Sequence, residues 1–336
     1  MRNRKNYTLE IIKVIAAYMV VFIHVPFPGK LGVALNALAR FAVPFFFMVS
    51  GFFSRGISTD RIKKRAKNLL VLFLVAAAVY ILKDLALMVL RNDVKGMKQY
   101  FIAYLDAKVL GKLIVFNWPP MSGHLWFLLA LAYVYGILYL IAKYKISKKW
   151  LYGASIVLLI AHFALGEIGL LFGFAVPALY VRNFLLFGMP FFGLGMLLHK
   201  HLDKIQPLTE KCSNWLIFLM LLLGIGATLV SRQFLGVTEL CIGSLLMLTA
   251  MMTIAIKYSK RRYPKPVKLV AACSNYIYLF HPLVAGVLKV GYGMVGVATE
   301  MMQYLHPVAV CLISTALALI INWLFDKDSR KKKKRK

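Results

Sequence analysis

Long apolar segments recur along this chain, and short segments rich in polar and basic residues separate them. An apolar run of about 20 residues is long enough to cross the hydrocarbon core of a bilayer as an α-helix. The pattern therefore predicts an all-α, polytopic integral membrane bundle without a soluble domain. We expect about ten transmembrane helices, near residues 7–26, 33–54, 68–90, 123–142, 150–168, 182–199, 213–231, 235–256, 268–292 and 304–325.

Composition agrees with a membrane protein. Of the 336 residues, 61% are hydrophobic and 16% are charged, against roughly 25% charged in an average soluble domain. The first apolar segment is longer than a signal-peptide core and no cleavage site follows it, so we expect a first spanning helix. The four cysteines have no close spacing, which favours buried small side chains over a disulfide framework or a metal site.

Basic residues are concentrated in alternate connecting segments. Most lysines and arginines lie in residues 1–5, 55–67, 143–149, 199–211, 257–268 and 327–336. Such an excess marks the cytoplasmic side, so we expect both termini there, with a membrane domain over 1–326 and a basic tail over 327–336. Topology and attraction to anionic lipid then account for the net charge of +30, and we expect no nucleic-acid partner.

Residues 91–122 form the longest segment on the opposite side. They are too polar to span a membrane, yet they include apolar and aromatic stretches such as YFIAYL and LIVFNWPP. The pattern favours an interfacial helix, or a loop that dips toward the outer face.

The first predicted helix, TLEIIKVIAAYMVVFIH, contains polar residues that are costly in a bilayer. Lys13 and His24 are eleven residues apart, so at about 100° per residue they project from one face, roughly 16 Å apart along the axis. Glu10 precedes Lys13 by one turn and can pair with it. Two explanations stay open. Either Lys13 snorkels to the inner interface and His24 caps the outer end, or His24 ends a polar stripe as a general base.

Three further segments place polar residues in or beside predicted helices. Arg40 lies in the outer half of the second helix, where a guanidinium needs a carboxylate, a phosphate or an anionic intermediate. The segment GHLWFL contributes His124 and Trp126, for which boundary polarity and interfacial anchoring are the simpler alternatives. In SNYIYLFHP, helical spacing puts polar residues on one face, which suits either a functional stripe or interhelical hydrogen bonds. These residues are Ser274, Tyr278 and His281. His162 and Glu239 are isolated polar residues to which we assign no role.

Together these segments resemble the membrane-bound acyltransferase-3 family (O-acetyltransferase-like integral membrane proteins). TLEIIKVIAAYMVVFIH keeps the family's spacing as Lys13-x10-His24, with Glu10 at the usual aspartate and lysine at the usual arginine. VPFFFMVSGFF is similar to its VP-FF-x-x-SGF helix, and RIKKRAKNLL to its basic loop before the third helix. GHLWFL and SNYIYLFHP look like its later elements. The resemblance covers essentially the whole chain, and the second-helix match is the most specific.

The resemblance implies O-acyl transfer, usually of acetyl, from cytoplasmic acyl-CoA to a hydroxyl of an exported glycan or envelope molecule. It implies a bacterial plasma membrane protein whose partners are the bilayer, acyl-CoA as co-substrate and the acceptor, with no bound cofactor and no metal. His24 would act as general base or as a transient acyl carrier, and Lys13, Glu10 and Arg40 would complete the catalytic group. Arg40 would stabilise the oxyanion at the thioester carbonyl.

The same resemblance suggests where the two substrates bind. A cationic loop would hold the donor phosphates, with Arg65-x-x-Asn68 and Lys64-x-x-Lys67 as alternative family pairs. The donor-binding residues would be Arg61, Lys63, Lys64, Arg65 and Lys67. The acceptor pocket would include Ser50, His124, Trp126, Ser274, Tyr278 and His281.

Two other classes of function compete with the enzyme. Polytopic proteins with intramembrane charges are often transporters, so a transporter or flippase of glycan intermediates or small substrates is the main alternative. A structural scaffold would leave the register of Lys13 and His24 and the stripe near residue 281 unexplained. Turnover of labelled acyl-CoA discriminates the enzyme from both.

Overall fold

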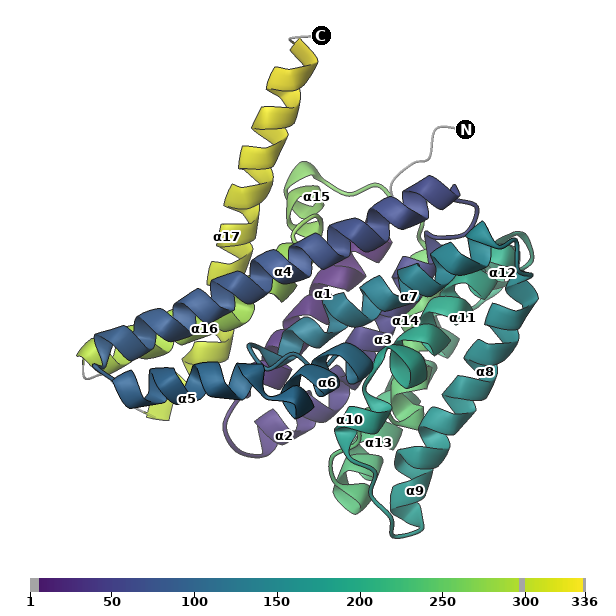
Figure 1. Cartoon of the computed structure of the whole chain (residues 1–336). Helices are drawn as coiled ribbons and strands as arrows, with labels where there is room; N and C mark the ends of the chain where they lie inside the picture. Colours follow the sequence, from purple (N-terminus) through teal and green to yellow (C-terminus); the bar gives the residue numbers. More distant parts are fainter. Residues whose placement is uncertain (1–5, 296–299, 335–336) are drawn as a thin grey trace. The chain divides into compact units, whose positions relative to one another are not determined.

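The computed structural model describes residues 6–295 and 300–334, and within these ranges it contains helices and loops but no β-strand (Figure 1). This confirms the predicted all-α class. Seven helices are long and apolar enough to cross a membrane, and two bent helix pairs would raise the number to nine. The chain is thus a multi-pass membrane protein, while the expected total of ten spans is not confirmed.

The shortfall lies in the segment predicted as a helix over 235–256. Helix α13 (Asn214–Leu235) ends at Gly236, whose φ of 78° is open to glycine and strained for other residues. An irregular stretch follows, and helix α14 (Ile242–Lys257) starts only after Cys241. With 16 residues, α14 is shorter than a full span of about 20 residues.

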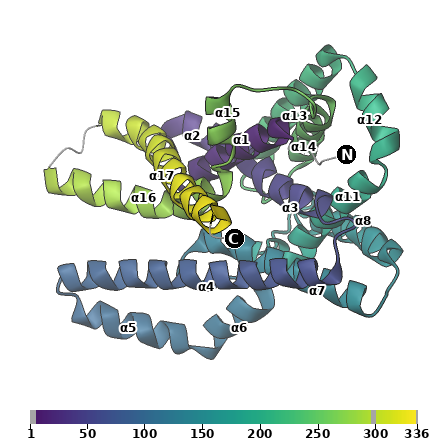
Figure 2. The ribbon, with the colours of Figure 1, turned by 90° about the horizontal axis from the view of Figure 1, so that it is seen from above.

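The chain packs as two compact units, Met1–Phe46 with Asp203–Lys336, and Phe47–Leu202. In the first unit, α1 (Tyr7–His24) packs against most of the other helices. These are α2 (Gly29–Leu38), α14, α15 (Lys265–Ala271), α16 (Ser274–Val295) and α17 (Glu300–Lys334). The pairs α16–α17 and α13–α14 lie side by side (Figure 2). Asn6 caps α1 by accepting a bond from the backbone N–H of Leu9 at 3.0 Å.

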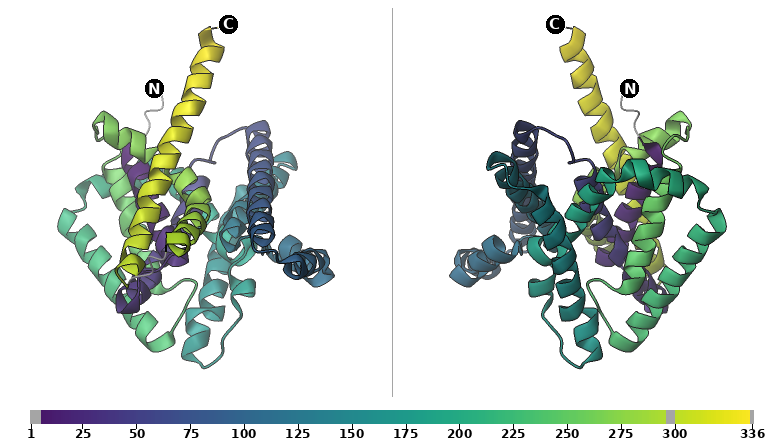
Figure 3. Two further views of the ribbon diagram at one scale, coloured as in Figure 1. Left: turned by 90° about the vertical axis from the view of Figure 1, so that its left-hand side faces the viewer. Right: turned by 90° about the vertical axis from the view of Figure 1, so that its right-hand side faces the viewer.

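The second unit contains helix α4 (Thr59–Leu90), which packs along α7 (Trp126–Lys143), and helix α8 (Lys148–Leu165), which packs along α11 (Met189–Lys200). The long α4 and the two short helices that follow it can be traced in Figure 3. Its remaining elements are the end of α3 (Ala42–Phe52), α5 (Val94–Leu105), α6 (Ala107–Phe116), η2 (Gly123–Leu125), α9 (Glu167–Leu171), α10 (Ala178–Val181) and the π-helical turn η3 (Phe184–Gly188). Helix α12 (Leu202–Lys211) leads back to the first unit. Residues 91–122 thus contain two short helices.

Close approach of α3 and α11 depends on two glycines. A Cβ atom on Gly51 would lie 1.9 Å from the carbonyl oxygen of Phe192, and one on Gly195 would lie 1.9 Å from that of Met48. Only residues without a side chain allow the backbones this close. The glycine of the SGF element therefore permits close packing of α3 on α11.

Two predicted boundaries change in the structure. The segment 55–67, predicted as a basic loop, is wrong as a loop: α4 begins at Thr59 and includes the RIKKRAK run. Lysine, arginine and alanine are good helix formers, Asp60 lies in the first turn, and no glycine or proline interrupts residues 59–90. The predicted helix over 268–292 is instead α15 and α16, which meet at 62°.

Candidate active site

The first unit brings together two histidines that lie far apart in the sequence. His24 is the last residue of α1, and its ring centroid lies 5.3 Å from that of His281 on α16. His24 is exposed, whereas His281 is fully buried. One imidazole can thus meet a substrate while the other is fixed beside it.

Proline in the next position explains how His281 is oriented. Pro282 has no N–H, so it cannot make the helical bond to the carbonyl of Tyr278. The Nδ1 atom of His281 takes that place, 2.8 Å from the Tyr278 oxygen and 3.2 Å from the Ile277 oxygen. Because a carbonyl only accepts, Nδ1 donates, and in the neutral ring the lone pair lies on Nε2.

The predicted stripe on α16 is buried as a group. Ser274 begins the helix with 1% of its surface exposed, and the ring of Tyr278, 5% exposed, lies 6.2 Å from that of His281. The Tyr278 ring also packs edge-on against Phe46. These contacts join the stripe to the histidine pair.

At the other end of α1, the predicted ion pair between Glu10 and Lys13 is present. The Nζ atom of Lys13 donates to a Glu10 carboxylate oxygen at 3.2 Å. The exposed fraction is 15% for the Lys13 side chain and 14% for that of Glu10. Helix α1 is continuous through Lys13 and His24, as the same-face argument requires.

Arg40 sits in a short 3-10 turn, η1 (Ala39–Phe41), between α2 and α3. Pro44 lacks the N–H that would bond the Arg40 carbonyl in an α-helix, which favours this tighter turn. The guanidinium donates to Glu239 at 3.1 Å and to Asn36 at 2.9 Å. Glu239, an isolated polar residue without an assigned role in the sequence analysis, is thus the carboxylate that Arg40 requires.

In the second unit, Arg65 points back into the protein. Its Nη1 atom lies 3.2 Å from the Phe53 carbonyl and 3.1 Å from the hydroxyls of Ser54 and Tyr135. The Ser54 hydroxyl in turn donates to the Ser50 carbonyl at 2.6 Å. The other four predicted donor-binding residues are exposed on α4. They are Arg61, Lys63, Lys64 and Lys67.

His124 and Trp126 are buried in the same unit. The Nδ1 atom of His124 lies 2.8 Å from the Ser122 hydroxyl, and its ring packs edge-on against Tyr80 at 5.0 Å. The Arg182 guanidinium lies over the rings of Trp118 at 4.4 Å and Trp126 at 5.7 Å. Trp126 is thus packed inside the unit and cationic Arg182 stacks on it.

The predicted residues therefore fall into two sets. Glu10, Lys13, His24 and Arg40 belong to the first unit with the α16 stripe, whereas Ser50, His124, Trp126 and the basic residues of α4 belong to the second. Their proposed catalytic and binding roles stay predictions.

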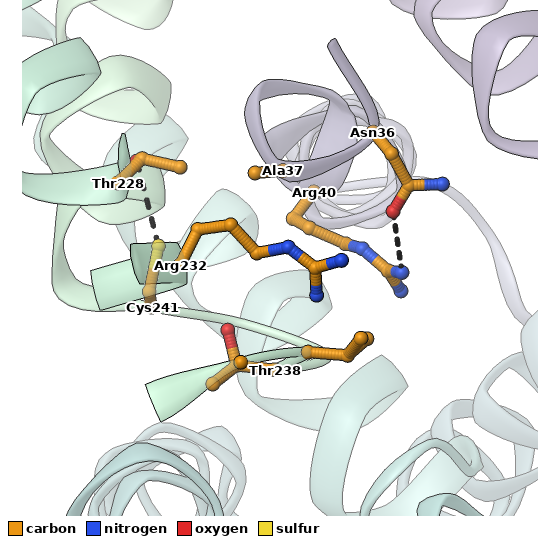
Figure 4. A pocket seen from close by; sticks show the side chains of 9 residues that line it. Asn36, Ala37, Arg40, Thr228, Arg232, Thr238 and Cys241 are labelled. Atoms are coloured by element: carbon orange, nitrogen blue, oxygen red, sulfur yellow. Dashed lines mark hydrogen bonds between the residues drawn. The ribbon is translucent and has the colours of Figure 1, made fainter. Parts of the chain in front are cut away.

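Sequence reasoning missed several polar partners that lie in or beside apolar segments, where a charge needs a counter-charge. In the first unit these are Glu239, which pairs with Arg40, and Asn36 and Arg232, which line the same pocket as Arg40 (Figure 4). In the second they are Tyr135 and Arg182. The Arg40 position predicted an acid but did not indicate which one.

A protein-family model described as an acyltransferase domain matches residues 6–326, nearly the whole chain. No curated protein and no solved structure is significantly similar to this chain.

Proposed function

Because the chain belongs to the acyltransferase-3 family, we propose that it transfers an acyl group, usually acetyl, from cytoplasmic acyl-CoA to a hydroxyl of an exported glycan or envelope molecule. The observation that carries this proposal is the pairing of His24 with His281 at the end of a membrane-length helix. An imidazole beside a second, orientation-fixed imidazole is suited to moving a proton near neutral pH.

In the proposed reaction, His24 removes the proton from the acceptor hydroxyl as its oxygen attacks the thioester carbonyl. The carbon–sulfur bond breaks, and the proton is returned to the thiolate, so that an ester and CoA-SH leave. In the alternative order, His24 itself receives the acyl group and passes it to the acceptor. His281 acts through His24 as a positioning residue in both.

The charged pair Glu10–Lys13 at the start of α1 is suited to binding the acyl-CoA donor. We assign the cytoplasmic side to this end from the distribution of basic residues. Lys13 offers a positive charge to the donor, and Glu10 holds its ammonium group in place. The exposed lysines and arginines of α4 remain the proposed dock for the CoA phosphates.

Radiolabelled acetyl-CoA and the purified protein in lipid nanodiscs test the proposal. Wild type should release or transfer acetyl, and His24→Ala should lower kcat by about 100- to 10,000-fold, the usual contribution of a general base. Lys13→Ala should instead raise KM for the donor. His201→Ala, a histidine outside both groups of predicted residues, is the matched control and should behave as wild type.

Two results would reject this function. If wild type turns over no acyl-CoA of any chain length, transport of a glycan intermediate or small substrate becomes the leading explanation, and uptake into proteoliposomes tests it. If His24→Ala keeps wild-type kcat, the acyltransferase activity stands but His24 is not its general base.

A further inference from the structure

A small pocket opens beside the Arg40–Glu239 ion pair in the first unit. About 220 Å³ of empty space, its open side included, lies between α2, η1, the end of α13 and the stretch before α14. Its polar lining residues are Asn36, Arg40, Thr228, Arg232, Thr238 and Cys241. Figure 4 shows the guanidinium groups of Arg40 and Arg232 turned toward the same space.

The charges of this pocket do not balance. Arg40 is paired with Glu239, and its bonds to Glu239 and Asn36 hold it in place. Arg232 is half-buried, and among the residues that the structure describes its guanidinium has no acceptor and no ion-pair partner. A half-buried arginine near the end of a spanning helix is costly unless an anion accompanies it.

We propose that this pocket binds an acid group, a carboxylate or a phosphate, carried by the acceptor molecule. The inference rests on the proposed function, because that function requires an acceptor molecule in addition to acyl-CoA. Two guanidinium groups that line one pocket match the oxygens of such an anion, and the Thr238 hydroxyl adds a donor. The pocket is small and open on one side, so it admits one acid group and not a whole glycan.

This assignment changes the role predicted for Arg40. Its charge acts on the acid group of the acceptor and not on the oxyanion of the thioester. An acidic sugar and a lipid-linked phosphate both carry such an anionic group, and the experiment below distinguishes between them.

The test uses the full chain in phosphatidylcholine nanodiscs, whose headgroups carry no net charge. Thermal unfolding is titrated with two matched pairs of probes: methyl glucuronide against methyl glucoside, and geranyl phosphate against geraniol. We expect at least one acid to raise the melting temperature while its neutral partner does not. The pair that responds identifies the source of the acid group.

Variants at Arg232 decide whether the pocket is responsible. Arg232→Gln should weaken apparent affinity for the acid by about tenfold or more, and Arg232→Lys, which keeps the charge without the planar fork, by less. Arg262→Gln removes the same charge from an exposed position of the same unit and should bind as wild type. If Arg232→Gln does not fold, the comparison uses Arg232→Lys. Weaker binding of the acid by Arg232→Lys than by Arg262→Gln then shows that the pocket is responsible.

The inference is overturned if neither acid stabilises the protein more than its neutral partner, or if both Arg232 variants bind as well as wild type. Acetyl-CoA turnover by the same wild-type preparation is measured separately. Absence of that turnover rejects the acyltransferase proposal. Acid binding that is unchanged in both Arg232 variants rejects only the proposed pocket.

Discussion

The α1–α16 region and the α3–α4–α7 region bury polar groups in different ways. The α3–α4–α7 region holds a closed hydrogen-bond network. The Arg65 guanidinium donates to the Ser54 and Tyr135 hydroxyls, and the carbonyls of Phe53 and Ser50 accept from these groups. In the α1–α16 region, His24 stays exposed beside the buried imidazole of His281.

This difference suggests that the α3–α4–α7 region serves mainly the stability of the fold and the α1–α16 region mainly catalysis. A network in which every member bonds to another rigidifies the packing of its helices. A histidine that is exposed on one side and positioned on the other can meet a substrate. Substitutions in the α3–α4–α7 region should therefore act mainly on unfolding, and those in the α1–α16 region mainly on turnover.

The largest effect is expected at Gly51, where α3 meets α11. Gly51→Val would place its side chain against the Phe192 carbonyl, which a Cβ alone would approach to 1.9 Å. Since backbone must move, the free energy of unfolding should fall by roughly 3 kcal/mol or more. Circular dichroism during thermal unfolding in nanodiscs measures this. Gly153→Val, on a helical glycine of the same unit with nothing within 4 Å, is the control and should change little. Equal stability of the two variants would contradict the packing argument.

Arg65 and Lys64 offer the next test, because they are neighbours on α4 with opposite surroundings. Arg65→Met removes the N–H group that donates to both the Ser54 and Tyr135 hydroxyls and should lower the free energy of unfolding by about 2 kcal/mol. Lys64→Met, at an exposed position, should stay within about 0.5 kcal/mol of wild type but raise KM for acetyl-CoA if α4 docks the donor. A reversed pattern would make Lys64 the structural residue and Arg65 the donor ligand.

Arg65 and Lys64 also illustrate which features of the fold could be predicted from the sequence. Hydrophobic runs predicted the all-α class and most of the helices, because bilayer thickness imposes their length. The helical start of α4 was missed, since charged residues looked like a loop between spans although they are good helix formers. The pairing of Glu10 with Lys13 was predictable from helical spacing, whereas the pairing of Arg40 with Glu239 depends on tertiary packing between distant segments.

In the α1–α16 region, His281→Asn tests the positioning role. Asparagine can donate to the Tyr278 carbonyl as the imidazole does, but it offers His24 no imidazole nitrogen. We expect kcat to fall about tenfold with little change in KM or melting temperature. His162→Asn, on a buried histidine of the other unit, is the control and should leave kcat unchanged in the fraction that folds. A loss confined to stability would make His281 a structural residue only.

The smallest effect is expected at Pro282, which touches neither substrate in the proposed reaction. Pro282→Ala restores a backbone N–H that competes with the His281 ring for the Tyr278 carbonyl. Alanine also favours the helix, so the melting temperature should rise slightly while kcat falls about threefold as the imidazole loses its fixed orientation. Opposite signs for stability and turnover would be difficult to explain by damage to the fold. If both rise together, the carbonyl released by proline does not orient His281.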